Sequence, residues 1–330
     1  MISRIFQIWR PESFHGTGKN NKFFEGWFFK MVDESRQHVY AVIPGIFMGS
    51  KPQESHAFIQ ILDGKTHSSS YHKFPLSQFK AAHDKLNIQI DSNHFSDKKI
   101  FLHINSQERN IQGEVYFDNL KPWPVRLFSP GVMGWYAFVP FMECFHGVLS
   151  LDHTLSGQFS TDNEIISFDN GSGYMEKDWG RSFPEAYIWM QCNHFDQSGI
   201  SLSASVAKIP WITGAFRGFI IGLWWDNQLY PFTTYNGATL NRVKIKDQEI
   251  VIEVQNSHHL LRIKAEMANQ GQLHGPFENQ MLSRVSESLD SRLELEFFER
   301  SGNQLRNLLR ITGEPAGVEA NGKLEELTTA

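Results

Sequence analysis

The sequence has few of the residues on which several classes of protein depend. Only two of its 330 residues are cysteine, Cys144 and Cys192, which is too few for a disulfide framework. Lysine and arginine are scattered and the formal net charge is −5. The chain therefore lacks the concentrated basic face that binds nucleic acid or anchors a protein to anionic lipid. We expect no nucleic-acid partner, and nothing in the sequence implies an obligate protein partner.

Long apolar runs and cofactor motifs are also missing. The longest uncharged run, residues 127–142, is interrupted by two prolines and two glycines, which argues against a membrane-spanning helix. The first residues, Met1–Phe6, show no apolar signal region. The sequence contains neither a metal-ligand spacing nor a Gly-rich phosphate loop, so we expect no metal and no other cofactor. These absences predict a cytoplasmic protein, with peripheral membrane contact left open.

Aromatic residues and two-residue alternation are what the sequence has instead. It contains 27 Phe, 9 Trp and 8 Tyr, which fill cores or line a pocket for an apolar ligand. Residues 86–90 and 293–297 alternate as half-buried strands do. Residues 218–225 and 250–254 are more continuously apolar, as in strands with two covered faces. Residues 281–289 have apolar residues at helical spacing and predict either one or two helical turns or a loop.

The chain is long enough for two domains. One set of expected strands runs from residue 23 to 166 and a second from 186 to 318. The Gly-rich and polar stretch 169–184 is expected to be the junction. Meandering strands over this length predict an all-β fold, either a sandwich array or two tandem antiparallel β-barrels packed against each other. We place the two domains at residues 1–182 and 183–330.

Two carboxylates in the expected junction are the leading candidates for chemistry. Glu176 and Asp178 are two residues apart, so on an extended backbone they share a face with Tyr174. Among aromatic rings such as Trp179 and Phe183, a carboxyl group loses hydration and can stay protonated, which makes it a general acid. The structural alternative is that Glu176 pairs with Lys177 or Arg181 while Asp178 anchors a turn.

The strand expected over residues 187–193 has two unlike faces. One face is apolar and typical of a core. The other carries Tyr187, Trp189, Gln191 and Asn193, whose rings and amides suit an amphipathic ligand. A strand that exposes its amides to solvent is the alternative.

Near the N-terminus, Glu25 stands among five aromatic residues. By alternation it shares a face with Phe23, Trp27 and Phe29. We expect either a second buried acid or, as the favoured interpretation, a partner for an arginine on a neighbouring strand.

Four of these segments together resemble the tocopherol cyclase family. That family has an F-F-E-G-W-Y-F-K-like run, a Y-x-E-K-N-W-G-like run, an F-P pair and a W-x-Q-C-N strand. The matching segments here, in the same order, are residues 22–30, 174–180, 183–184 and 189–193, and the resemblance covers most of the chain. It implies two lipocalin-like β-barrels in tandem. It also extends to carotenoid 1,2-hydratases and fungal decalin-forming cyclases, which use the same paired-barrel plan.

The resemblance implies acid-initiated cyclisation of a prenylated hydroquinone to a chromanol, an isomerisation of a hydrophobic substrate that needs no cofactor. In that reaction Glu176 donates the proton, Asp178 accepts the phenol proton or tunes the acid, and Tyr174 faces the cation. Hydratases of this group use a Tyr-x-Asp element, which Tyr174 and Glu176 match. The predicted substrate-binding residues are Glu25, Trp27, Trp179, Phe183, Tyr187, Trp189, Gln191 and Asn193. The alternatives are an isoprenoid or carotenoid hydratase and a non-catalytic isoprenoid- or lipid-binding protein.

The sequence also departs from the family pattern. Asp178 stands where plant cyclases have Asn, and Phe28 replaces a common Tyr. Arg181 and Ser182 replace small residues. These differences leave the substrate open.

A second open question is the apolar segment 131–142. If it is exposed, it is a flap that admits a substrate dissolved in a membrane. If it is buried, it lines a barrel or packs between barrels, which is the interpretation we favour.

Overall fold

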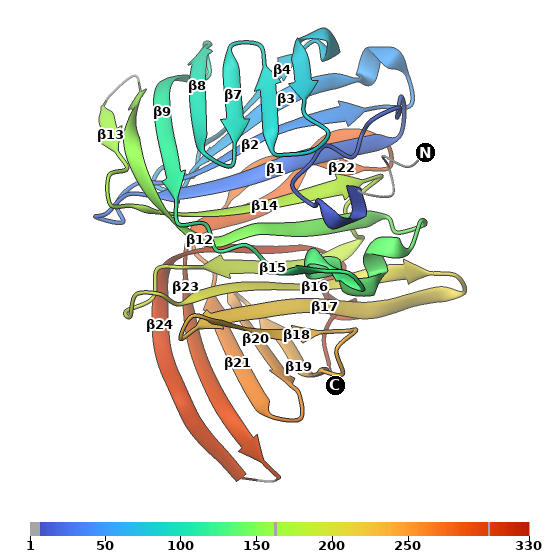
Figure 1. Ribbon diagram of the computed structural model, residues 1–330, viewed down its shortest axis with the longest axis vertical. Coiled ribbons are helices and arrows are strands. Elements are labelled where there is room, and N and C mark those ends of the chain that lie inside the picture. Colours follow the sequence, from blue (N-terminus) through green and yellow to red (C-terminus); the bar gives the residue numbers. More distant parts are fainter. Residues whose placement is uncertain (1–6, 162–163, 303, 330) are drawn as a thin grey trace. The chain divides into compact units, whose positions relative to one another are not determined.

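The structure is a computed structural model that describes residues 7–161, 164–302 and 304–329. Residues Met1–Phe6, in which we found no signal region, lie outside the described residues. The fold is almost entirely β and contains two large antiparallel sheets (Figure 1). The predicted all-β, tandem lipocalin-like fold is therefore confirmed, with each expected barrel present as one large sheet. Among the residues described, no helix is long and apolar enough to cross a membrane.

The chain forms two compact units. The first consists of the residues up to Phe183 together with Gln272–Arg284, and the second of Pro184–Gly271 with the residues from Val285 onward. Residues 272–284 thus pack with the first unit, although the sequence analysis places them in the second domain.

A 12-stranded antiparallel sheet builds the first unit, and its strands follow the order β4-β3-β2-β1-β14-β12-β9-β8-β7-β6-β5, with β13 beside β12. The strands are β1 (Phe23–Val32), β2 (Val39–Met48), β3 (His56–Asp63), β4 (Ser69–Phe74), β5 (Phe79–Ala81), β6 (Asn87–Ile90), β7 (Asn93–Ser96), β8 (Lys99–Asn105), β9 (Asn110–Asp118), β12 (Cys144–Thr161), β13 (Ile165–Ser167) and β14 (Ser172–Gly180). A short separate pair is formed by β10 (Val125–Arg126) and β11 (Ser129–Pro130). Short 3₁₀ turns occur at η1 (Gln7–Trp9), η2 (Pro52–Glu54), η3 (Leu76–Gln78) and η4 (Gly131–Phe138).

The second sheet has ten strands in the order β18-β17-β16-β15-β24-β23-β21-β20-β19, with β22 beside β23. The strands are β15 (Ala186–Cys192), β16 (Ser201–Trp211), β17 (Gly214–Trp225), β18 (Gln228–Thr233), β19 (Thr239–Lys246), β20 (Glu249–Gln255), β21 (His259–Glu266), β22 (Gly271–Phe277), β23 (Gln280–Ser301) and β24 (Gln304–Gly322), followed by η5 (Leu324–Glu326). A turn at Asp226 and Asn227 joins β17 to β18, and both residues have positive φ, as the tight hairpin requires.

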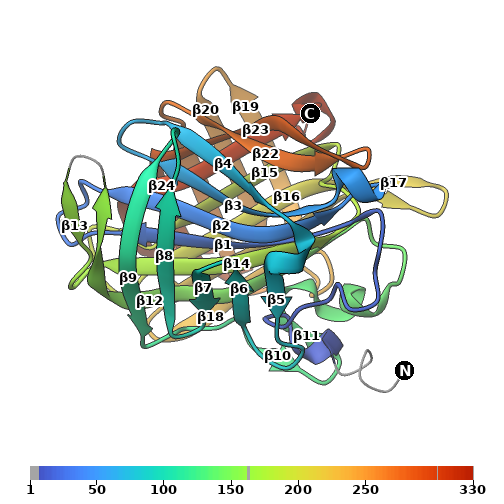
Figure 2. The ribbon, with the colours of Figure 1, turned by 90° about the horizontal axis from the view of Figure 1, so that it is seen from above.

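Strand β14 shows that residues 172–180 are not a junction. This segment lies in the middle of the first sheet, hydrogen-bonded to β1 on one side and to β12 on the other (Figure 2). These residues do not form the junction because most of their polar side chains are paired inside the protein. The two units divide at the end of the predicted stretch, between Phe183 and Pro184. Residues 281–289 are also neither helix nor loop but part of β23. Strand pairing with β22 and β24 decides their conformation, since helical spacing over a short segment is a weak signal.

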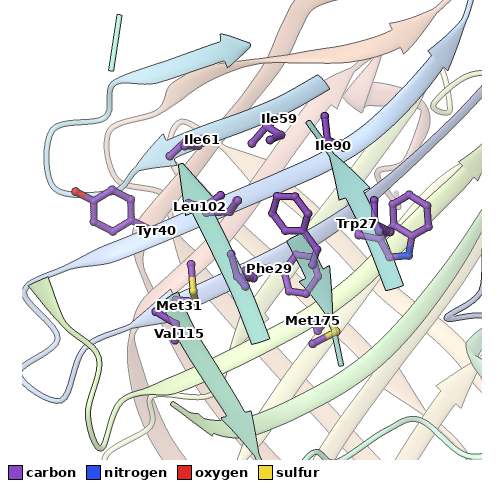
Figure 3. Close-up of a cluster of buried hydrophobic side chains, with 14 of the residues drawn as sticks. Trp27, Phe29, Met31, Tyr40, Ile59, Ile61, Ile90, Leu102, Val115 and Met175 are labelled. Atoms are coloured by element: carbon purple, nitrogen blue, oxygen red, sulfur yellow. The ribbon is translucent and has the colours of Figure 1, made fainter. Parts of the chain in front are cut away.

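The core of the first unit gathers residues from both halves of its sheet. Trp27, Phe29 and Met31 of β1 and Met175 of β14 point into it, opposite Leu102 of β8 (Figure 3). Alternation along β1 therefore sends one set of side chains inward, as the sequence predicts. Because β14 pairs with β1 in register, with Phe29 opposite Met175, its odd-numbered residues share this interior face.

Candidate active site

Strand β14 carries two polar clusters, one on each face. Tyr174, Glu176 and Asp178 project from one face, as predicted from their spacing. Lys177 and Trp179 project from the other, toward the side on which Met175 joins the core. The two-residue period of the strand therefore separates groups that are adjacent in sequence.

The first cluster, which we call the acid cluster, consists of Tyr174, Glu176, Asp178 and His146 of β12. The Tyr174 hydroxyl donates to Glu176 Oε2 at 2.5 Å. His146 is the register partner of Asp178, and its Nδ1 lies 2.9 Å from Asp178 Oδ1 while its Nε2 lies 3.6 Å from Glu176 Oε2. The cluster is largely removed from solvent, since Tyr174 is fully buried and Glu176 is 5% exposed.

The charge state of His146 follows from these contacts. Burial by itself lowers the pKa of an imidazole, but the carboxylates of Asp178 and Glu176 outweigh it and raise the pKa of His146 to about 9. His146 is therefore an imidazolium at neutral pH. Burial also raises the pKa of the neighbouring Cys144 thiol, which keeps that thiol protonated and unreactive.

The same three side chains offer ligands that a divalent ion could share. The ligand atoms of His146, Glu176 and Asp178 lie within 4.8 Å of one another. An imidazolium has no lone pair for a metal, so ion binding requires His146 to lose its proton first. His146 therefore cannot be an imidazolium and a metal ligand at the same time.

The second cluster is a buried ion pair on the opposite face. Lys177 Nζ lies 2.6 Å from Glu25 Oε1, and both side chains are fully buried. The ammonium lies over the rings of Trp27 and Trp179, 4.8 and 4.6 Å from their centroids. Burial alone would raise the pKa of Glu25, but Lys177 and His15 hold it below its usual range, so the pair is ionised.

This ion pair fastens the N-terminal segment to the sheet. Lys177 donates to the carbonyl oxygens of Pro11 and Ser13 and to His15 Nδ1 at 2.8 Å, while Glu25 accepts the His15 backbone N–H. Burial and the nearby Lys177 lower the pKa of His15, so its ring is neutral. With Nδ1 as acceptor, Nε2 carries the hydrogen and donates to the Gln7 carbonyl at 3.1 Å.

The structure brings some of the predicted site residues together and separates others. Tyr174, Glu176 and Asp178 form one cluster, whereas Glu25, Trp27 and Trp179 belong to the opposite face. The cation that pairs with Glu25 is Lys177 and not the arginine that we expected. Phe183 packs edge-on against Phe24, with ring centroids 5.3 Å apart.

The remaining predicted residues lie in the second unit, on or just beyond β15. Ile188, Met190 and Cys192 point into that unit's core, as expected. On the other face, the Tyr187 hydroxyl donates to Glu319 at 2.7 Å and Gln191 donates to Asn193 at 3.2 Å. Trp189 lies against Gly317, where a Cβ would be only 2.8 Å from the ring. The ligand-binding role of these residues stays a prediction.

His146, Lys177 and His15 are not among the site residues predicted from the sequence. Lys177 could have been found, because alternation places it on an apolar face with Met175 and Trp179, and a buried lysine needs a buried acid. His146 carries no such signal, since its role depends on the pairing of β12 with β14.

A first prediction concerns the buried ion pair. Lys177→Met leaves the Glu25 carboxylate buried without its cation, so we expect the free energy of unfolding to fall by about 3–5 kcal/mol. The double variant Lys177→Met/Glu25→Gln removes both charges, so its free energy of unfolding should fall by less than that of the single variant. Guanidinium unfolding followed by circular dichroism measures both. Equal losses in the two variants would show that the charge pair does not matter.

A second prediction concerns pH. The pKa of His146 in the folded protein, about 9, lies above its ordinary value of 6.5. Protonation of His146 therefore stabilises the folded state fully below pH 6.5, and this stabilisation is lost as the pH rises through 9. A tenfold change in the proton affinity of a group corresponds to about 1.4 kcal/mol. The free energy of unfolding should therefore decrease between pH 6.5 and 9, and His146→Gln should flatten this slope. His103→Gln, at an exposed site, is the matched control and should keep it. An NMR titration of His146 with a midpoint near 6.5 would contradict this account.

Comparison with known proteins adds relatives in sequence and in fold. Residues 117–322, more than half of the chain, match the family described as tocopherol cyclase-like. The chloroplastic tocopherol cyclase of Zea mays is 26% identical over 197 residues, which cover 57% of this chain and 41% of that protein. The probable chloroplastic tocopherol cyclase of Oryza sativa subsp. japonica is 26% identical over 202 residues, with coverage of 57% and 42%. The chain thus spans less than half the length of these relatives.

Two solved structures share the fold at low sequence identity. The crystal structure of CghA with Sch210972 has a TM-score of 0.56 and 8% identity, covering 91% of this chain and 88% of that chain. The crystal structure of kievitone hydratase from Nectria haematococca has a TM-score of 0.50 and 10% identity, with coverage of 91% and 89%. These likenesses concern the fold alone, whereas the family match rests on sequence. From that match, this chain belongs to the tocopherol cyclase-like family.

Proposed function

We propose that this chain cyclises a prenylated hydroquinone to a chromanol by proton-initiated ring closure. The observation that carries the proposal is the chain of hydrogen bonds and ion pairs from the buried Tyr174 and Glu176 through His146 to the partly exposed Asp178. An alkene is a weak base, so its protonation needs an acid held away from water. The acid cluster supplies such an acid on a family member whose relatives include tocopherol cyclases.

The atoms balance without any oxidant or cofactor. In the proposed reaction the His146 imidazolium passes its proton to Glu176, and Glu176 gives it to the trisubstituted alkene. The phenol oxygen attacks the tertiary cation, and Asp178 takes the phenol proton. Asp178 returns this proton to His146, so the cluster ends as it began. General acid catalysis of this kind contributes about 10²–10⁴-fold, and holding the flexible chain in a reactive pose contributes further.

Tyr174 has a second part in this scheme. Its hydroxyl donates to the same Glu176 oxygen that His146 approaches, which fixes the carboxyl group in one orientation. Its ring also offers a face that stabilises a cation by about 0.5–2 kcal/mol.

We further propose that an apolar surface of the first unit contacts a membrane in which such a substrate dissolves. The apolar surface patch consists of Leu127, Phe128, Trp135, Phe138 and Phe141, which are 65, 81, 46, 41 and 43% exposed. Trp9 joins its parts by packing on Phe138 and donating to the Leu127 carbonyl. The segment 131–142 is therefore neither wholly buried nor wholly exposed: Gly131–Gly134 is buried, and the larger rings that follow are not.

A third prediction tests the chemistry. Incubation with a prenylated benzoquinol in D₂O should yield a chromanol with one carbon-bound deuterium, because the proton on the new C–H bond comes from an exchangeable acid. Glu176→Gln should reduce turnover by about 100-fold or more. Mass spectrometry of the product measures both quantities.

The matched control for this experiment is Glu34→Gln, which makes the same change at an exposed site and should leave turnover unchanged. A product heavier by one water would support the hydratase alternative instead. Full activity of Glu176→Gln would remove this residue as the donor. Binding of the quinol without turnover by the unchanged protein would favour a carrier.

A fourth prediction tests the apolar surface patch. The protein should float with phosphatidylcholine liposomes, and Trp135→Ser/Phe138→Ser should weaken flotation because it removes two exposed rings. The control is Ile165→Ser/Ile212→Ser, which alters two exposed apolar residues outside the patch. Flotation that survives the first double variant would remove the membrane contact.

A further inference from the structure

The first unit contains a pocket at the end of β14, and Trp179 lines it from the face of the strand opposite Glu176. Its volume is about 320 Å³, which is within the range of small-molecule sites. Phe145 and Trp179 form one wall, where their rings stack with centroids 5.5 Å apart, and His15 stacks on Trp179 at 4.2 Å. Met133 and Met142 add flexible apolar surface.

The charges around this pocket have one sign. Lys19 and Arg181 line it and are exposed, which places them where the pocket meets solvent. The Lys19 ammonium lies 5.3 Å from the ring centroid of Phe23, another lining residue. Among the described residues, no Asp or Glu lines the pocket. An apolar interior with a cationic rim matches a molecule that has an apolar chain and an anionic head.

The pocket wall on the N-terminal side is held rigidly. We call residues 7–19 the strap, because six of them line the pocket. The buried Lys177–Glu25 pair fixes its backbone at Pro11, Ser13 and His15. A preformed wall reduces the entropy that a ligand loses by ordering its site, which distinguishes this pocket from a transient surface groove.

We propose that this pocket is a second ligand site that binds a single-chain amphiphile by its apolar chain, with Lys19 and Arg181 contacting an anionic head. The site goes beyond the proposed cyclisation, because its ring-lined wall lies on the face of β14 opposite the acid cluster. His146 belongs both to the pocket lining and to the acid cluster, so the two sites adjoin at the start of β12 and the end of β14.

Calorimetric titration with decanoate, decyl sulfate and decanol tests this site. Both anions should bind at one site per chain, about tenfold more tightly than decanol, since two exposed ion pairs each contribute up to about 1 kcal/mol. Lys19→Gln/Arg181→Gln should bring the anions to the affinity of decanol and leave decanol unchanged. Met133→Trp fills the pocket and should abolish binding of all three.

Two further variants make the outcome decisive. Lys121→Gln/Arg310→Gln removes two cations elsewhere and should not alter the preference for anions. Glu176→Gln should bind decanoate as the unchanged protein does; loss of binding there would show that the pocket is part of the catalytic site and would overturn a second site. Thermal unfolding checks that each variant is folded. Binding that persists in folded Met133→Trp would place the ligand elsewhere and overturn the proposal.

Discussion

The ion pair between Lys177 and Glu25 is the interaction on which the first unit's site depends. A lysine and a glutamate without solvent contact are costly to bury unless they meet each other and satisfy their remaining hydrogen bonds. Here the Lys177 ammonium reaches Glu25, His15 and two carbonyl groups of the strap. The charged pair therefore determines where the N-terminal segment lies, and that segment closes one side of the pocket.

The same pair constrains the register of β14. Because Lys177 must lie on the same face of the sheet as Glu25 of the neighbouring strand β1, Glu176 and Asp178 must point to the opposite face. A slip of one residue would move Lys177 to the face of the acid cluster, away from Glu25, and would place both acids on the face that meets the apolar core. The orientation of the acid cluster is thus secured by an interaction on the opposite face of the strand, in which no member of the cluster takes part.

The parts of the fold that the sequence predicts are those set by local alternation. The strands around residues 86–90 and 250–254, the inward face of β1 and the shared face of Tyr174, Glu176 and Asp178 all follow from a two-residue period. Pairings between distant strands cannot be predicted this way. For that reason local patterns predict a junction where β14 lies, set Trp179 near Glu176 and give no sign of His146. Each of these depends on which strand lies beside which, and that is decided by the whole sheet.

The contact between His146 and Asp178 gives a physical meaning to one departure from the family pattern. An Asn at position 178, as in plant cyclases, would accept a hydrogen bond from the imidazole but would bring no charge to it. With Asp178 in place, the imidazolium is favoured over the neutral ring, and the buried cluster holds one cation between two acids. Asp178 then acts through His146, since it keeps a proton stored 3.6 Å from the Glu176 carboxylate. In the cyclisation that we propose, the acid that protonates the alkene needs such a nearby supply at each turnover, because a buried carboxyl group has little access to protons from water.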